Sequence, residues 1–266
     1  MITMTILASL ALSQANAGGI TSLAAGPVGS IASGGWDSQG RIWTSAGTAR
    51  RSFSGGAYQV TGLAYSRDGS RIALTYGDGR LFVYESQTSV LLWSKSTGTS
   101  FASGVGFLPN GNIVTSGYDN LLKQWNGRTG ALIRTYRGLP SDAYGMAVSR
   151  DGRMVAGTGP NGFAVWDTAT GRLIHRSAVQ GMTGNDIRFS PDGKEVYIQM
   201  LAGGVRWYAA RTGAPLGEIS YDAWSMDLSP SGRHLAIGAR NGEVILFQLG
   251  KGEVMRRKVS EKTIGF

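Results

Sequence analysis

Cysteine is absent from the sequence, and its absence excludes several kinds of chemistry at once. Without a thiol, the chain can form no disulfide, no thiolate metal site, no cysteine nucleophile and no covalent haem attachment. Histidine is almost absent too, since His175 and His234 are the only two, and they lack the close spacing of a helical zinc site. The sequence therefore predicts no metal site and no cofactor.

Charge and long apolar runs are also scarce. Only 16% of the residues are charged, whereas 41 of the 266 are glycine. No segment is as long and apolar as a transmembrane helix, and no long stretch has the 3.6-residue period of an amphipathic helix. This composition predicts a folded, turn-rich domain that is large enough for a sizeable core.

A unit of about 40 residues is repeated along the chain. In residues 142–177, alternating apolar residues and three turn signals predict four short antiparallel strands. The glycine of the first turn recurs at intervals of 39 to 42 residues, and a sixth, less regular copy comes before the others. The glycines are Gly29, Gly69, Gly111, Gly152, Gly193 and Gly232. An aromatic residue follows each of them 14 or 15 positions later, and we predict that these residues are core: Trp43, Tyr84, Trp125, Trp166, Tyr208 and Phe247.

Four strands in each 40-residue period predict an all-β fold, the β-propeller, because one small sheet cannot bury both its faces and must stack on neighbours. Six copies between Ile20 and Val259 predict six four-stranded blades in a single domain over residues 18–266. The sequence resembles the WD-repeat propeller family through Trp166-Asp167, the Ser-Pro-Asp-Gly of residues 190–193 and the period. The resemblance is specific for architecture, and it implies the propeller fold. Because the family's Gly-His dipeptide is missing, its histidine network is not expected, and the blades should be held by packing.

Residues 1–17 carry no charge, contain an apolar run from Ile6 to Leu12 and end in Ala15-Asn16-Ala17. This pattern is typical of a secretory signal cleaved before Gly18, and it predicts an exported protein, periplasmic or secreted. The alternative is an extra edge strand that closes the propeller of a cytoplasmic protein.

Basic residues exceed acidic ones, with 26 Lys and Arg against 17 Asp and Glu and a net charge of +9. They are dispersed over several repeat positions, whereas nucleic-acid-binding proteins gather them on one face. A protein partner, possibly acidic, is therefore favoured, with a polysaccharide or membrane surface as alternatives, and nucleic acid is disfavoured.

Two sets of residues are candidates for partner binding. The first consists of aromatic residues in the loops that enter the first strands and in the turns between second and third strands. Its members are Trp36, Tyr58, Tyr76, Phe101, Tyr118, Tyr144, Tyr221 and Trp224. Rigid aromatic side chains beside glycine are typical of binding hot spots, although some could instead fill gaps between blades.

The second set lies in the first strands of the last two copies. Earlier copies have small residues at two positions of this strand, as in Gly145 and Ala147, but the fifth has Asp186 and Arg188 and the sixth has Ser225 and Asp227. We predict an ion pair between Arg188 and Asp227 that locks neighbouring blades together. The alternative is a polar patch on the central channel that contacts a ligand.

The sequence motifs do not indicate catalysis. Gly157, Gly159 and Gly162 match a dinucleotide fingerprint by letters, but they form a hairpin and not the start of a helix. No Gly-x-Ser-x-Gly elbow is present, and the aspartates of the repeated turn are expected only to form that turn. The sequence predicts a non-enzymatic protein-interaction scaffold with no catalytic residues. The alternative is a lactonase-like or lyase-like propeller enzyme with a polar or metal site in its channel.

Overall fold

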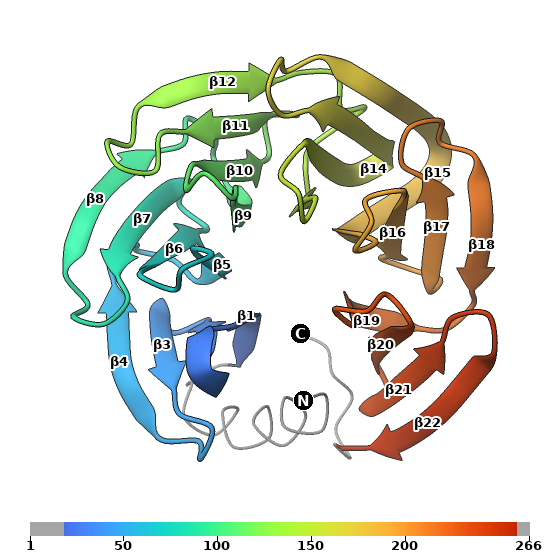
Figure 1. The fold of residues 1–266 in the computed structure, drawn as a ribbon, viewed down its shortest axis with the longest axis horizontal. Helices are drawn as coiled ribbons and strands as arrows, with labels where there is room; N and C mark the ends of the chain where they lie inside the picture. Colours follow the sequence, from blue (N-terminus) through green and yellow to red (C-terminus); the bar gives the residue numbers. More distant parts are fainter. Residues whose placement is uncertain (1–18, 260–266) are drawn as a thin grey trace. The chain divides into compact units, whose positions relative to one another are not determined.

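The structure, a computed structural model, describes residues 19–259, and they fold almost wholly into antiparallel β-strands (Figure 1). Within this range the only helical element is the 3-10 turn η1 (Pro27–Gly29). No helix of the described residues has the length and apolar character needed to cross a membrane. The expected signal peptide, residues 1–17, lies outside the described range.

The chain divides after Tyr136 into two compact units. Unit 1 contains three four-stranded sheets, and in each of them the strands pair in chain order. The first sheet consists of β1 (Ile20–Ala25), β2 (Ile31–Gly35), β3 (Gln39–Trp43) and β4 (Ala49–Ser54). The second consists of β5 (Val60–Tyr65), β6 (Arg71–Tyr76), β7 (Arg80–Glu85) and β8 (Leu91–Ser96). The third consists of β9 (Ala102–Phe107), β10 (Ile113–Gly117), β11 (Leu122–Trp125) and β12 (Leu132–Tyr136).

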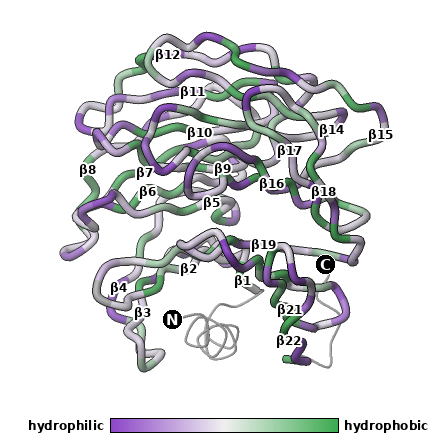
Figure 2. Tube along the Cα trace, turned by 45° about the vertical axis from the view of Figure 1, so that its right-hand side comes forward, coloured by the Kyte–Doolittle hydropathy of each residue, from purple (hydrophilic) through white to green (hydrophobic). Residues whose placement is uncertain are grey.

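Unit 2 contains a six-stranded sheet and a four-stranded sheet, again paired in chain order. The larger sheet consists of β13 (Gly145–Val148), β14 (Met154–Asp167), β15 (Leu173–Phe189), β16 (Glu195–Met200), β17 (Val205–Ala209) and β18 (Pro215–Ile219). The smaller consists of β19 (Ala223–Leu228), β20 (His234–Ala239), β21 (Glu243–Gln248) and β22 (Gly252–Lys258). Figure 2 shows hydrophilic and hydrophobic stretches mixed along the chain. The second strands β14 and β16 are buried along nearly their whole length, whereas the last strand β22 is exposed throughout.

The all-β β-propeller class predicted from the sequence is confirmed, but the count of six four-stranded blades is wrong: the described residues form five sheets. The fourth and fifth repeats share one sheet because β15 continues from the outer strand of one repeat into the first strand of the next. Pro160 pairs with Thr183 across this junction. The connecting segment stays extended because Met182 is buried and Val179 packs against the same core.

The repeated turn between the first and second strands is built by local side-chain hydrogen bonds. The Ser66 hydroxyl donates to Asp68 Oδ1 at 2.6 Å and accepts from the Arg71 N–H at 2.9 Å, while Asp68 Oδ1 accepts from the Ser70 N–H at 3.1 Å. The following Gly69 has φ +70°, a conformation that favours glycine. The same Ser-to-Asp bond recurs at 2.7 Å in the turns of Asp151 and Asp192, which confirms the predicted turn-forming role of these aspartates.

The aromatic residues of the third strands are core, as predicted. Trp43, Trp125 and Trp166 are buried, as are Tyr84 and Tyr208, while Phe247 is half-buried. Packing is not their only contact, contrary to the expectation from the missing histidine. The indole N–H of Trp43 donates to Ser33 Oγ at 2.8 Å, and that of Trp125 donates to Thr115 Oγ1 at 2.9 Å.

Small residues in the first strands allow successive first strands to approach closely. A Cβ added to Gly62 in β5 would lie 3.1 Å from the Cα of Gly104 in β9. A Cβ added to Gly145 in β13 would lie 2.8 Å from the Cα of Asp186 in β15 and 2.7 Å from the Asn185 oxygen. Since the neighbouring atoms are backbone, they can yield only if the strands move apart.

We therefore expect Gly145→Ala to lower the free energy of unfolding by about 1 to 3 kcal/mol, the usual cost of overpacking a core. Chemical denaturation measures this loss. Gly238→Ala is the matched control, because its added Cβ would meet only the Ser225 side chain, which can rotate away. Equal stability of the two variants would contradict the close approach of β13 and β15.

The hydrogen bonds of this turn predict a lowered pKa for the Asp68 carboxyl group, which can be measured. The Ser66 hydroxyl, followed by the Ser70 donors, lowers the pKa of Asp68 from 3.8 to about 2. Since this pKa is lower in the folded state, the bond stabilises the fold above about pH 3.8, and its contribution is lost as the pH falls through about 2. We expect Ser66→Ala to move the pKa of Asp68 back toward 3.8 in a carboxyl NMR titration. Asp151 keeps its own serine and should titrate as before; an unchanged pKa for Asp68 would contradict this account.

Candidate functional site

The aromatic candidates of unit 1 lie where second strands end and first strands begin. The Trp36 N–H donates to the Gly19 oxygen at 3.2 Å, and the Tyr118 N–H donates to the Phe101 oxygen at 3.0 Å. In the second sheet the Gly77 N–H makes the equivalent bond to the Gln59 oxygen at 3.0 Å, next to Tyr58. These backbone bonds fix the three loops at the same end of their sheets.

Hydrogen bonds between sheets align these ends within unit 1. Thr21 donates its hydroxyl to the Val60 oxygen, and Thr61 donates to the Ala102 oxygen at 2.5 Å. Both threonines lie where the register of the first strand shifts, so each bond joins the start of one first strand to the start of the next. Trp36, Tyr58 and Tyr118 therefore lie at one end of unit 1, which we call the aromatic end.

The three side chains of the aromatic end are exposed although they are large. The exposed fraction is 60% for Tyr58, 41% for Trp36 and 40% for Tyr118. The Tyr118 ring rests on the half-buried Phe101 ring with 4.7 Å between centroids. The inclusion of Tyr76 among the loop aromatics was wrong, because this side chain is fully buried, edge-on to the Phe82 ring.

Three aspartates that the sequence reasoning missed support the aromatic end. Asp37 binds Arg41 at 2.7 Å, and Asp119 binds Lys123 at 2.5 Å; each pair joins the turn after a second strand to the following third strand. Asp78 accepts the Ala57 N–H at 3.1 Å and so ties down the loop of Tyr58. Their constant spacing of 41 residues was a signal that could have found them.

The aromatic candidates of unit 2 are less accessible, since Tyr144 and Trp224 are both half-buried. Trp224 lies at the register shift of β19, where the Arg240 guanidinium is 4.4 Å from its ring centroid. Arg240 is held there by Asp222 at 3.3 Å. One face of the indole is thus covered by a cation within the chain.

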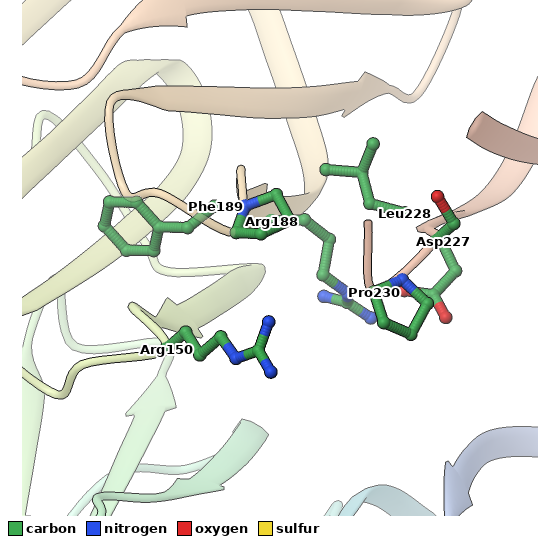
Figure 3. Close-up of a pocket in the computed structure, with 8 residues that line it drawn as sticks. Arg150, Arg188, Phe189, Asp227, Leu228 and Pro230 are labelled. Atoms are coloured by element: carbon green, nitrogen blue, oxygen red, sulfur yellow. Dashed lines mark ion pairs between the residues drawn. The ribbon is translucent and has the colours of Figure 1, made fainter. Parts of the chain in front are cut away.

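The charged candidates come together around Arg188, whose side chain points away from β15 toward Asp227 of β19 (Figure 3). The predicted ion pair is confirmed, with 3.7 Å between Arg188 Nε and Asp227 Oδ1. The closer partner was not predicted: Asp186, two residues earlier in the same strand, lies 2.5 Å from Arg188 Nη1. The Asp227 side chain is 78% exposed and that of Asp186 only 25%, so the pair between Arg188 and Asp227 is open to water.

The electrostatics of this cluster follow from its geometry. Burial raises the pKa of Asp186, and the neighbouring Asp186 carboxylate raises the pKa of Arg188, which therefore stays cationic. Residues 19–259 contain no group of three or more His, Asp or Glu side chains placed to hold a metal ion. Asp186 and Asp227 are instead both directed at the guanidinium.

Comparison with protein families gives two matches. The model described as "WD domain, G-beta repeat" matches residues 8–44 and 91–126. A model described as "Outer membrane protein assembly factor BamB" matches residues 139–261.

Two curated proteins are similar over much of the chain. Autophagy-related protein 16 of Arabidopsis thaliana is 22% identical over 238 residues, which cover 85% of this chain and 47% of that protein. Target of rapamycin complex subunit wat1 of Schizosaccharomyces pombe is 25% identical over 158 residues, which cover 57% of this chain and 50% of that protein. The chain is a WD-repeat-like β-propeller. This WD-repeat-like propeller spans about half the length of the curated relatives that it matches.

Double-mutant cycles on the propeller should rank the two ion pairs of Arg188. We expect a coupling free energy below about 1 kcal/mol for Arg188 with Asp227, because water screens an exposed pair. A larger coupling, about 1.5 to 3 kcal/mol, is expected for Arg188 with Asp186, a hydrogen bond between charged and partly buried groups. Denaturation of Arg188→Gln, Asp186→Asn, Asp227→Asn and the double variants measures both. A stronger coupling to Asp227 would reverse this ranking.

Proposed function

We propose that this WD-repeat-like propeller is a non-enzymatic protein-interaction module that binds a protein partner at the aromatic end of unit 1. The observation that carries the proposal is the exposure of Trp36, Tyr58 and Tyr118 at one end of three aligned sheets. Large aromatic side chains are enriched in the buried centres of protein interfaces.

The aromatic end is already ordered before a partner arrives. Backbone hydrogen bonds fix Trp36 and Tyr118, and Asp78 fixes the loop that contains Tyr58. Aromatic side chains also have few rotatable bonds, so little conformational entropy is lost when they are covered. Each can contribute a large contact area, which makes these three residues the expected hot spots of the interface.

The relatives support the same class of function. One of them is named as a subunit of the target of rapamycin complex, and membership of a protein assembly is consistent with a binding module. The enzyme alternative gains little from the charged cluster, because Asp186 and Asp227 both form ion pairs with the same Arg188 guanidinium.

Affinity capture from the source cell, with quantitative mass spectrometry, tests the proposal. We expect wild-type protein to retain a partner that the Trp36→Ala, Tyr58→Ala, Tyr118→Ala variant loses. The control is Leu91→Ala with Leu92→Ala on β8, which removes two side chains of similar exposure, 47% and 48%, from another surface. Both variants should have melting temperatures close to that of the wild type.

Titration of the captured protein with the single variants then measures how much each aromatic residue contributes to binding. We expect single substitutions at the aromatic end to weaken binding by up to about 30-fold, as for a hot spot of about 2 kcal/mol. A partner that the triple variant still retains, or that the leucine variant loses equally, would refute the aromatic end as the docking surface.

A further inference from the structure

A separate hollow lies in unit 2, at the opposite end of the first strands from Tyr144 and Trp224 (Figure 3). Its volume is about 370 Å³, within the usual range of ligand-binding pockets. Three copies of the turn between first and second strands surround it. Arg150, Pro191 and Pro230 line it from the equivalent position of each turn, which in all three turns directly follows a serine.

Two arginines from different strands and turns reach this hollow. Arg188 enters from the end of β15, and Arg150 enters from the turn between β13 and β14; Figure 3 shows both side chains extending into the same space. Arg188 already has two carboxylate partners. Arg150 is exposed, and no carboxylate of residues 19–259 lies within ion-pair distance of it. Within the described part of the chain, Arg150 is thus a cation of the hollow that has no counter-charge.

Apolar groups make up much of the remaining lining. Phe189 and Leu228 are half-buried at the ends of β15 and β19, and the rings of Pro191 and Pro230 border them. A matching ligand must place a negative charge beside Arg150 and apolar groups beside these four residues. A free inorganic ion supplies only the first of these.

The nearby Asp227 adds a repulsion that grows with the negative charge of the bound anion. Its carboxylate also lines the hollow and is 78% exposed. A phosphate carries close to two negative charges at neutral pH, so the Asp227 carboxylate repels it more strongly than it repels a ligand carboxylate, which carries one. A carboxylate also matches the planar guanidinium with two parallel hydrogen bonds.

We propose that this hollow binds the carboxylate of a glutamate or aspartate side chain in an extended peptide segment, with apolar neighbours of that residue against Phe189 and Leu228. Arg150 is the principal donor, and Arg188 adds a second positive charge that Asp186 keeps in place. This site lies in a different unit from the aromatic end, so it is a second binding site and does not depend on the function proposed above.

NMR titration of the full chain with short peptides tests the site. The probe is the tripeptide Leu-Glu-Leu with both termini blocked, and the Nε–Hε signal of Arg150 reports on binding. We expect this peptide to shift that signal at millimolar concentrations, whereas blocked Leu-Gln-Leu, which has the same shape without the charge, should not. Leu-Gln-Leu with a free carboxyl terminus tests whether a chain terminus can replace the side chain, and sodium phosphate tests a simple anion.

Matched variants distinguish a specific contact of the peptide with Arg150 from a general attraction to the positive charge of the protein. We expect Arg150→Gln to weaken binding of the glutamate peptide by about 10-fold or more, the effect of losing a charge-assisted hydrogen bond. Because this variant lacks the Arg150 signal, its binding is followed through the Nε–Hε signal of Arg188, which lines the same hollow. Arg67→Gln is the control, because Arg67 is also exposed and occupies the same position of the turn in unit 1, far from the hollow in sequence. It should bind the peptide as the wild type does, and so should the triple variant of the aromatic end.

Several results would overturn the proposal. They are no shift of the Arg150 signal with the glutamate peptide, equal binding of the glutamine peptide, equal losses in Arg67→Gln and Arg150→Gln, or tighter binding of phosphate than of the glutamate peptide. A negative result in the peptide titration would not contradict the function proposed for the aromatic end, because the variant of that end is tested in a separate experiment.

Discussion

Close approach between successive first strands is the constraint on which the other features of each unit depend. A four-stranded sheet exposes two faces, and neither can be buried within the sheet itself, so each must be covered by a neighbouring sheet. At Gly62 and Gly145 the neighbouring strand is so near that even one methyl group would meet backbone atoms. Glycine in these strands is therefore a packing requirement, and it is distinct from the glycines that form turns.

This constraint leaves few positions for functional side chains. On the face that approaches the next first strand, the middle of a first strand admits mainly small residues, so exposed functional side chains are found at its two ends. At one end, Thr21 and Thr61 use their hydroxyl groups to join sheets, and exposed aromatic residues lie in the adjoining loops. At the other end, serine and aspartate close the turns, and the exposed turn position is available to residues such as Arg150.

The fifth and sixth repeats are the exception to this rule, because their first strands carry charged residues. Asp186 and Arg188 are two residues apart, so their side chains lie on the same face of β15, and the long arginine can turn back onto its neighbour. That local contact is shorter than the contact to Asp227 across the sheets. The equivalent positions of two repeats predict the longer contact to Asp227, whereas the shorter contact to Asp186 forms within a single strand.

The sequence by itself determined the features that depend on residues near one another in the chain. The 40-residue period, the glycine turns and the place of each core aromatic follow from bonds that span at most one repeat, as in the Ser66 to Asp68 turn. Only the tertiary structure decided the number of sheets, because the continuity of β15 depends on the burial of Met182 among residues of other strands. It also decided which aromatic side chains are exposed: Tyr76 ends β6 and Tyr118 directly follows β10, and the first is enclosed against Phe82 whereas the second is 40% exposed. Burial is a property of packing between segments distant in sequence, and residue type and spacing do not specify it.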